Sequence, residues 1–360
     1  MKQYLDLLQN ILDNGVEKES GRNNMPNTIG ISNGIIRMNL QEGFPLLTTK
    51  KMYWKGIVHE LLWFLRGETN IKYLVDNKVN IWNGDAFRWY NDVYVAKHGA
   101  PKLTMEEFIL KVKNNDKYFY PNKTQEYIID NYTYGDLGKV YGYQWRNQND
   151  VDQIKDIIDG LKANPYSRYH ILDGWNKADF KDMALPPCHL LYQFIVRPLT
   201  LEEREVIAVE RGIYSKEEFT NLVGEKVSDE EYVPRLLDEE QNVPKFYLDL
   251  NMYQRSCDTF LGVPFNCASM SLLLMIMAKA SNMIAGTATW IGGDTHLYVD
   301  HVPMVKEQLN REPYSLPKMN INKNISSLED ILALTIDDFE LTDYVSHDTI
   351  KAELFTGLKK

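Results

Sequence analysis

The sequence feature that most restricts the fold is the stretch Asp182–Val196, which reads D-M-A-L-P-P-C-H-L-L-Y-Q-F-I-V. Pro186 and Pro187 fix the backbone and have no N–H to donate, so neither a helix interior nor a central strand can include them. The apolar run after them predicts a strand, with Cys188 and His189 at its rigid entrance. Because a thiolate is a far better nucleophile than a thiol, Cys188 is a candidate nucleophile. A thiol packed in the core is the alternative.

The composition is that of an ordinary globular protein, with 360 residues of which 44% are hydrophobic and 25% charged. This length suits one large domain or two smaller ones. No apolar run approaches the roughly 20 residues of a membrane span, and the N-terminus does not resemble a signal peptide, so we expect a cytoplasmic protein. The three cysteines, Cys188, Cys257 and Cys267, have no C-x-x-C spacing, which argues against a zinc site or a disulfide framework.

The net charge of −10 is concentrated in one segment, because residues 199–244 contain 13 acidic and 5 basic residues. An acidic chain is not an obvious nucleic-acid-binding protein, although a local cluster of arginines can still hold a phosphate. The segment's composition predicts short solvated helices at 201–212, 216–223 and 229–240, a surface addition without a role in chemistry. Residues 84–134 form another predicted insertion, of mixed polarity.

Hydrophobic periodicity predicts both helices and strands. Apolar residues recur every three or four positions over residues 3–15, a stretch that ends in a glycine, as helices often do. Residues 53–65 are apolar on nearly all sides and predict a buried helix that carries Glu60. Further helices are expected at 151–161 and 267–286, and strands are expected up to residue 40, at 246–253 and ending at 292–298.

Three stretches of this first half carry residue types that suit a ligand site. Glutamate is rarely buried without a partner or a task, so Glu60 is a candidate acid–base group, and a merely paired carboxylate is the alternative. Arg22 could bind an anion, although a solvated loop is its ordinary state. The aromatic and hydrogen-bonding residues at 140–146 are typical of the wall of a planar-ligand pocket or of a polar-rimmed core.

A second group of binding residues follows the strand at 246–253. Arg255 and Ser256 offer a charged and a neutral donor suited to a phosphate dianion, while Asn266 offers the donor and acceptor pair that reads a uracil-like edge. The sequence has no G-x-G-x-x-G, no P-loop and no two-histidine metal spacing. The sequence therefore points to a phosphate-bearing substrate and to no metal.

Several long motifs, in order, resemble those of the thymidylate synthase family, which includes the phage pyrimidine hydroxymethylases. The resemblance runs from the first helix to about Glu353 and is interrupted by insertions at about 84–134 and 198–245. It implies one catalytic domain over 1–360 with an α/β (α+β) fold, in which a large bent mixed sheet is packed with helices and one sheet face forms a homodimer interface. The motifs are G-F-P-L-L-T-T-K-K (43–51), H-E-L-L-W-F-L (59–65), N-I-W (80–82), G-D-L-G-K-V-Y-G-Y-Q-W-R (135–146), M-A-L-P-P-C-H (183–189), Y-Q-R-S-C-D-T-F-L-G-V-P-F-N (253–266) and G-G-D-T-H-L-Y (292–298).

The resemblance also implies a reaction. Cys188 would add to C6 of dUMP and make C5 a nucleophile toward the one-carbon unit of 5,10-methylenetetrahydrofolate, with no metal. Arg22, Arg255 and Ser256, with the partner subunit's Arg168, would hold the phosphate and favour the thiolate. The resemblance also implies that Asn266 binds the uracil edge, that His296 and Tyr298 bind the ribose hydroxyl and that Gln254 contacts the substrate. Asp258, Trp82 and Lys50 would contact the folate. Glu60 and Tyr141 would transfer protons through ordered water, and His189 would support the catalytic site.

The residue at position 266 also bears on substrate choice. Family members that act on cytosine nucleotides have an aspartate at the corresponding position, where it complements the exocyclic amine. Asn266 therefore favours dUMP as the substrate.

The chain departs from the synthase pattern in the parts that close the site. Synthases have T-G-T-G-T after the loop arginine, where this chain has N-N-M-P-N-T at Asn23–Thr28, and they usually end in a short apolar tail, where this chain continues over Leu354–Lys360. Smaller departures are Tyr169, which replaces the second of two paired arginines, and the sequence D-G-W-N at Asp173–Asn176. The two parts that meet on closure therefore both differ.

An altered lid bears on the fate of the methylene intermediate. Water would convert it to a hydroxymethyl group, whereas hydride transfer in a dry site would give a methyl group. We therefore expect a dUMP hydroxymethylase that forms 5-hydroxymethyl-dUMP and tetrahydrofolate, which would suggest a virus acting in its host's cytoplasm. Thymidylate synthase, which forms dTMP and dihydrofolate, is the alternative. A non-catalytic nucleotide- or RNA-binding regulator is a remote alternative, because a binder does not need the nucleophile Cys188.

Overall fold

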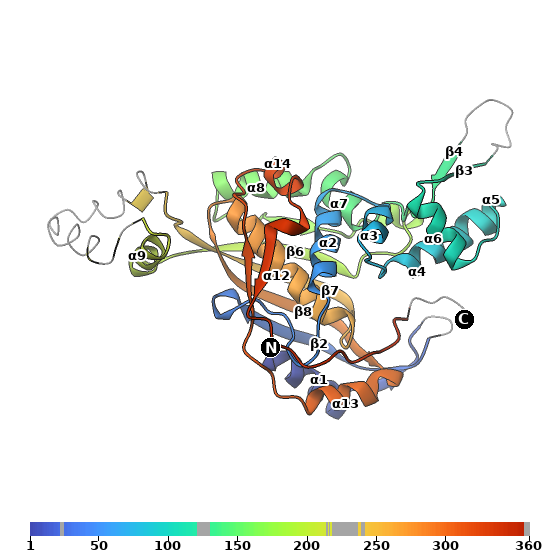
Figure 1. Cartoon of the computed structure of the whole chain (residues 1–360), viewed down its shortest axis with the longest axis horizontal. Coiled ribbons are helices and arrows are strands. Elements are labelled where there is room, and N and C mark those ends of the chain that lie inside the picture. Colours follow the sequence, from blue (N-terminus) through green and yellow to red (C-terminus); the bar gives the residue numbers. More distant parts are fainter. Residues whose placement is uncertain are drawn as a thin grey trace.

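The computed structural model describes residues 1–21, 25–120, 130–213, 215, 217, 237–238 and 242–355. Its centre is a six-stranded sheet in the order β1-β2-β8-β7-β6-β5 (Figure 1). Neighbouring strands are antiparallel except β7 and β8, which are parallel. The strands are β1 (Val16–Lys18), β2 (Thr28–Asn39), β5 (Ile171–Asp173), β6 (His189–Pro198), β7 (Phe246–Asp258) and β8 (Ile284–Tyr298).

Two irregularities bend the sheet. The register shifts between His189 and Leu191 in β6 and between Leu248 and Leu250 in β7. An extra residue in one strand makes that strand bend and twist, so these shifts account for a bent sheet. The first irregularity directly follows Cys188, at the strand entrance that the two prolines predicted. The expected large mixed sheet packed with helices is confirmed.

One face of the sheet is covered and the other is open. In β7 and β2 buried residues alternate with exposed or partly exposed ones, as in a strand that packs on one side only. Helix α12 packs on β7 and β8, α2 packs on α12, and α1 packs on β2. The larger helices are α1 (Lys2–Asn14), α2 (Trp54–Leu65), α6 (Met105–Lys113), α7 (Tyr141–Asn147), α8 (Gln153–Ala163), α9 (Leu201–Glu210), α12 (Gly262–Ala280) and α13 (Val302–Leu309).

Helix α12 is the central core helix. Among the described residues it alone has the length and apolar composition that a membrane span would need, and 78% of that stretch is buried in the protein. It begins at Gly262, earlier than the predicted 267, because the carboxylate of Asp258 accepts the N–H groups of Phe260 and Leu261 and turns the chain into the helix. It ends at Ala280, where a turn leads into β8.

The glycine after the first helix has a different reason from the one expected. The helix predicted at 3–15 is α1, but Gly15 has an extended backbone with φ of −70° rather than a left-handed one. A Cβ at Gly15 would lie 2.3 Å from the Ile11 carbonyl oxygen and 2.7 Å from the Ile29 side chain. Close packing between α1 and β2, not a positive φ, therefore requires the glycine.

The two predicted insertions lie at opposite ends of the molecule (Figure 1). The first is well packed, and Tyr94 and Tyr132 stack within it at 3.8 Å between ring centroids. In the second, the helix that the composition predicted at 201–212 is α9, which begins after a capping box at Thr200 and ends at Glu210. The helices expected at 216–223 and 229–240 lie almost entirely outside the described residues. The other elements of the first insertion are α4 (Asn83–Trp89), η2 (Tyr90–Val95), α5 (Ala96–His98), β3 (Lys117–Tyr120) and β4 (Asp130–Thr133).

The remaining elements are short and complete the helical layer and the C-terminal part of the chain. They are α3 (Lys72–Asp76), α14 (Leu328–Leu332), β9 (Lys318–Ile321), β10 (Phe339–Thr342), and the short helices η1 (Leu40–Glu42), η3 (Lys177–Asp182), η5 (Val299–His301) and η6 (Ile336–Asp338).

Candidate active site

Cys188 lies at the entrance of β6 and differs from the other two cysteines in its exposure. None of the three forms a disulfide, and Cys257 and Cys267 are buried whereas Cys188 is partly exposed. Burial raises the pKa of both Cys257 and Cys267. A nucleophile must reach its substrate as a thiolate, so the packed-thiol alternative applies to those two residues. Cys188 remains the candidate nucleophile.

Two neighbours fix the backbone of Cys188. Its N–H donates to Tyr141 Oη at 2.7 Å, and its carbonyl oxygen accepts the N–H of Arg255 at 2.9 Å. The Arg255 guanidinium donates to the carbonyl oxygens of Pro187 and Pro186, each at 2.8 Å. The two prolines, which cannot donate, thus serve as acceptors that hold a cation near the thiol.

The predicted phosphate-binding residues are only partly brought together within one chain. Arg255 uses two of the five N–H donors of a guanidinium on the prolines, and Ser256, next to it in β7, is partly exposed. Arg168 is exposed in the turn before β5, and its role in a partner's site stays a prediction. Arg22 lies outside the described residues.

Glu60 is buried in α2, as its apolar surroundings predicted. Its Oε1 accepts a 2.7 Å hydrogen bond from Trp82 Nε1. Burial raises the pKa of Glu60 to about 7, and the hydrogen bond from Trp82 opposes that rise. A carboxyl group that titrates near neutrality can both take up and release a proton, which is the property that a proton-transfer residue needs. The bond also uses the indole N–H of Trp82, a residue predicted to contact folate.

His189 is buried beside the nucleophile and stays neutral. Burial lowers its pKa to about 4, opposed by a hydrogen bond to the Asn266 side chain. Its Nδ1 lies 3.2 Å from Tyr192 Oη. An imidazole with so low a pKa is a weak base at neutral pH, so the geometry suits the predicted supporting role, in which His189 positions Asn266.

Tyr192 is a site residue that the sequence reasoning missed. It lies in β6, its pKa is raised by burial and then by the charge of Glu60, and its hydroxyl meets His189. Tyr192 is therefore near the charge of Glu60 and contacts the imidazole that bonds to Asn266. The only signal in the sequence was a hydroxyl-bearing residue at an inward position of the strand, which most tyrosines in strands share.

Asp258 and Lys50 were both predicted to contact folate, and the structure places them differently. Asp258 is partly exposed before α12 and uses Oδ1 for two backbone N–H groups. Lys50 is buried, its Nζ donates to the Phe260 carbonyl oxygen at 2.5 Å, and it lies 3.8 Å from the centroid of the Phe260 ring. Burial lowers the pKa of Lys50 to about 7. Its amine therefore supports the turn that carries Asp258.

Gln254 is also committed to the protein interior. Its Oε1 accepts the indole N–H of Trp290 at 2.9 Å, and its Nε2 donates to the Ser256 carbonyl oxygen at 3.0 Å. Both ends of the side-chain amide are thereby used. In this structure Gln254 fixes the backbone of Ser256, and direct contact with substrate stays a prediction.

The predicted ribose-binding residues lie at the end of β8, where the C-terminal tail meets them. The Tyr298 ring lies 4.7 Å from that of Phe355, between centroids, and the His301 ring lies 5.2 Å from it. His301 Nε2 also lies 2.9 Å from the Glu353 carbonyl oxygen. His296 Nδ1 lies 3.1 Å from the Asp294 carbonyl oxygen. The tail therefore packs against the site, although residues 356–360 lie outside the described part.

The sequence matches a known family over nearly its full length. A family profile described as thymidylate synthase matches residues 2–212 and 225–356. The chain is 41% identical over 354 residues to the thymidylate synthase of Malacoplasma penetrans (strain HF-2), which covers 98% of this chain and 99% of that protein. The thymidylate synthases of Mycoplasma mobile and Mycoplasma pneumoniae are 39% and 38% identical over 354 and 356 residues, with the same coverage.

Proposed function

The chain belongs to the thymidylate synthase family, a family of one-carbon transferases that use methylenetetrahydrofolate, and we propose that it is itself a thymidylate synthase acting on dUMP. The products are dTMP and dihydrofolate. The observation that carries the proposal is the position of Cys188 at the entrance of β6, where Tyr141 and Arg255 hold its backbone. This arrangement holds a nucleophile in place, beside a cation that suits an anionic substrate.

The proposed roles follow from the contacts. The thiolate of Cys188 adds to C6 of dUMP, and the electron pair moves toward C5, which becomes the nucleophile. Tyr141 and Arg255 hold the backbone of Cys188 in position. Asn266, positioned by His189, holds the uracil ring. Glu60, with its pKa near 7, relays protons to and from the ring through water. C5 bonds to the one-carbon unit and loses its proton, and tetrahydrofolate leaves to give an exocyclic methylene group. Hydride transfer from tetrahydrofolate to that methylene forms the methyl group and dihydrofolate, and elimination of Cys188 restores the C5–C6 double bond.

The folate contributes the one-carbon unit and the hydride. Among the residues predicted to contact it, Asp258 fits best, because it is partly exposed and only Oδ1 is used by described residues. Its other oxygen can accept N–H groups of a pterin-like ring. Trp82 contributes apolar surface, and Lys50 acts from within the core.

The comparisons do not support the expected hydroxymethylase. The alignments cover 98% of this chain and 99% of proteins named thymidylate synthase, so those proteins are about as long as this chain. The chain's overall length, including both insertions and the extended tail, is therefore compatible with a synthase. The contact of Phe355 with Tyr298 also suits a tail that covers the site and excludes water. The expected viral source has no support either, since the relatives named above are not viral.

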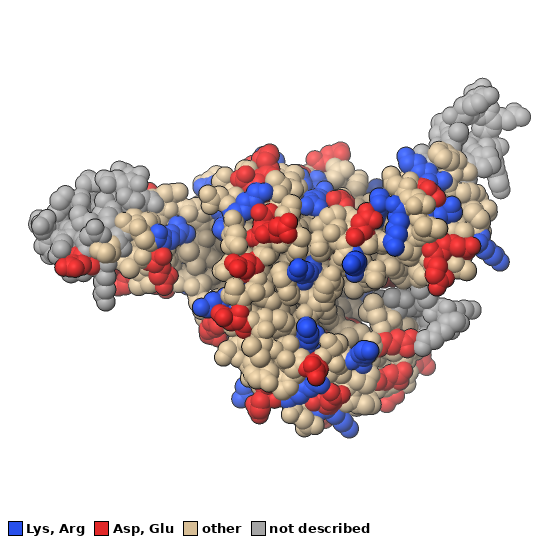
Figure 2. All heavy atoms as spheres, in the orientation of Figure 1, with Lys and Arg blue, Asp and Glu red and all other residues tan. Residues whose placement is uncertain are grey.

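A binding-only regulator is disfavoured by the surface and by the site. Acidic and basic side chains are interspersed on the face in Figure 2, and on its described residues no continuous basic surface suited to RNA is visible. The Cys188, Glu60 and Asn266 side chains form the kind of set that catalysis, not binding alone, requires. Enzyme catalysis in the cytoplasm by a single domain over residues 1–360 remains our proposal.

We also propose a homodimer formed through the open sheet face. Ile35, Ile195 and Tyr253 on β2, β6 and β7 are 54%, 41% and 39% exposed in the single chain. Tyr169, beside Arg168, is 88% exposed. Exposed apolar side chains on a sheet face favour burial against a second copy, which would also bring Arg168 to the partner's phosphate site.

A labelled hydride tests the synthase proposal. The protein is incubated with dUMP and methylenetetrahydrofolate that carries deuterium at C6 of the tetrahydropterin, and the nucleotide is analysed by mass spectrometry. We expect dTMP with one deuterium in its methyl group. A nucleotide that has gained a hydroxymethyl group, with the deuterium left in the folate, would falsify the proposal.

A further inference from the structure

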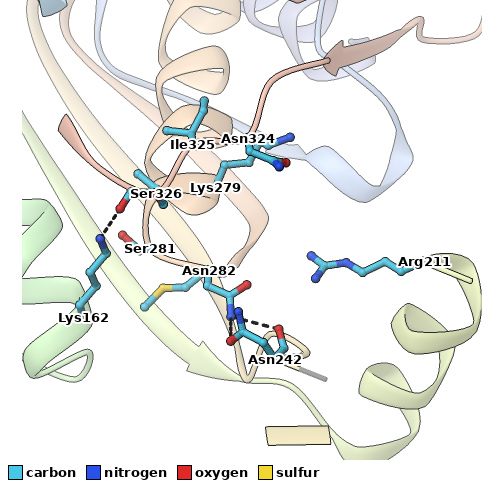
Figure 3. A pocket seen from close by; sticks show the side chains of 11 residues that line it. Lys162, Arg211, Asn242, Lys279, Ser281, Asn282, Asn324, Ile325 and Ser326 are labelled. Carbon is cyan, nitrogen blue, oxygen red and sulfur yellow. Dashed lines mark hydrogen bonds between the residues drawn. The ribbon is translucent and has the colours of Figure 1, made fainter. Parts of the chain in front are cut away.

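A cavity of about 780 Å³ lies at the base of the second insertion, far along α12 from the candidate active site (Figure 3). It opens to the surface and is lined by the ends of α8, α9 and α12 and by the segment 324–326. Asn266 and Lys279 are 13 positions apart on α12, which corresponds to about 20 Å along a helix. The cavity is therefore separate from the site around Cys188. Its polar lining comprises Lys162, Arg211, Asn242, Lys279, Ser281, Asn282, Asn324 and Ser326.

Three cations converge on this cavity without a carboxylate to balance them. Among the described residues, none of Lys162, Arg211 and Lys279 forms a salt bridge. Lys162 donates to the Ser326 carbonyl oxygen at 2.5 Å and Lys279 donates to that of Ile321 at 2.8 Å. With respect to the residues that the structure describes, each ammonium group therefore keeps two N–H donors and Arg211 keeps its whole guanidinium.

Two of the three cations, Arg211 and Lys279, are close enough to disfavour one another. Burial lowers the pKa of Lys279, and the charge of Arg211 lowers it further. In Figure 3 the Arg211 guanidinium extends from the end of α9 into the cavity, opposite the end of α8 that carries Lys162. The carboxylate of Asp330, on α14 nearby, is occupied by the N–H and the hydroxyl of Ser326. An anion in the cavity would relieve this repulsion.

Neutral groups complete the lining. Ser281 is 7% exposed, and its hydroxyl oxygen is buried with no hydrogen-bond partner among the described residues. Such an unsatisfied buried hydroxyl is unfavourable unless something in the cavity bonds to it. Asn282 Nδ2 donates to Asn242 Oδ1 at 2.8 Å, which closes the wall between the insertion and the turn before β8.

A second cavity of about 390 Å³ adjoins the first. Both are lined by Arg211, Lys279 and Met283, and the second adds the side chains of Met275 and Met319. Methionine surfaces adapt to flat or irregular apolar groups. A ligand with an anionic end and an apolar end can therefore use both cavities at once.

We propose that this junction binds a small organic phosphate, whose phosphate group lies between Lys162, Arg211 and Lys279 and whose planar or apolar part contacts the methionines. Cavities of this combined size hold small-molecule ligands. The guanidinium and the two ammonium groups supply charge-assisted hydrogen bonds to phosphate oxygens, and Ser281 supplies a further one. The site does not depend on the function proposed above.

Binding of adenosine 5′-monophosphate to the full chain tests the proposal, and the same titration of Arg255→Ala shows any part of the binding that occurs at the candidate active site. Isothermal titration calorimetry measures the dissociation constant in wild type, Arg211→Ala, Lys279→Gln and Lys102→Ala. Lys102 is exposed in the other insertion, shortly before α6. Lys102→Ala is the matched control, because it also removes one positive charge. We expect saturable binding that Arg211→Ala and Lys279→Gln each weaken about tenfold, the loss of one charge-assisted contact. Lys102→Ala should bind as wild type does.

Two further measurements separate a local effect from unfolding. Arg211 is exposed, so Arg211→Ala should keep the melting temperature and the dUMP turnover of wild type. If Lys279→Gln does not fold, the affinity of Arg211→Ala for adenosine 5′-monophosphate decides the test. Inorganic phosphate should bind more weakly than adenosine 5′-monophosphate. The proposal is overturned by an absence of saturable binding in wild type, by equal affinity in Arg211→Ala, or by inorganic phosphate binding as tightly as the nucleotide.

Discussion

Trp82 Nε1 donates a 2.7 Å hydrogen bond to Glu60 Oε1, and this bond joins two buried side chains that are 22 positions apart in the chain. Burial alone raises the pKa of Glu60, and the indole N–H limits the rise by stabilising the carboxylate. The bond therefore sets the pH at which Glu60 exchanges its proton.

Replacement of Trp82 by phenylalanine should move the pH profile of the reaction upward. Without the indole N–H the carboxylate is less stable, so the pKa of Glu60 rises above about 7 and the limb of kcat that reports it shifts to higher pH. Trp54→Phe, at the start of the helix that carries Glu60, is the control and should leave the pH profile of kcat unchanged. Identical profiles in wild type and Trp82→Phe would mean that Glu60 does not set the limb.

Glu60 should also make stability depend on pH. Its pKa is about 7 in the folded protein and 4.5 in the reference state. Its contribution to the free energy of unfolding is therefore fully present below pH 4.5 and is lost as the pH rises through about 7. The side chain stays neutral in Glu60→Gln. In denaturant unfolding, the free energy of unfolding of this variant relative to that of wild type should therefore rise by up to about 3 kcal/mol between about pH 4.5 and pH 8. Parallel stability curves would contradict this assignment.

Loss of the Tyr141 hydroxyl should slow the chemical step. In Tyr141→Phe the N–H of Cys188 loses its acceptor, and the thiol is free to move from its attacking position. We expect kcat to fall about 100-fold, the order of effect that a misplacement of about 1 Å produces. Tyr143→Phe, on the same helix, removes a hydroxyl that has no bond to Cys188 and should retain wild-type turnover. Equal rates for the two variants would show that the bond does not position the thiol.

The tail contact should control access of water. Phe355→Ala removes the ring that packs on Tyr298 and His301, and Leu354→Ala removes an adjacent, half-exposed side chain. We expect Phe355→Ala alone to release some 5-hydroxymethyl-dUMP beside dTMP, because water then reaches the intermediate. Chromatography of the nucleotides measures the ratio. A pure dTMP product from Phe355→Ala would show that this contact does not exclude water.

The elements that carry the site could be predicted because their signals are local. The prolines before Cys188 and the apolar run after them indicate the strand entrance, and the apolar surroundings of Glu60 indicate a buried helix. These signals depend on neighbours in sequence, and β6 and α2 confirm them.

The pairings within the site could not be predicted, because they depend on contacts between distant parts of the chain. Nothing near Glu60 indicates that Trp82 is its partner, and nothing near Gln254 indicates that its amide is satisfied by Trp290. Lys50 stands in a polar stretch of sequence, yet its amine is buried against Phe260, 210 positions away. The altered loop and tail motifs led to the expectation of a hydroxymethylase, which the comparisons do not support. The reason is related, since altered motifs do not reveal where Phe355 packs.

The ratio of dihydrofolate to dTMP tests the central claim most directly. Purified protein is incubated with dUMP and methylenetetrahydrofolate, dihydrofolate is followed by absorbance, and the nucleotides are quantified from the same samples, with Cys188→Ser as the blank. The account predicts one dihydrofolate for each dTMP and no turnover in the blank. Tetrahydrofolate and 5-hydroxymethyl-dUMP as the main products of the wild-type protein would contradict it.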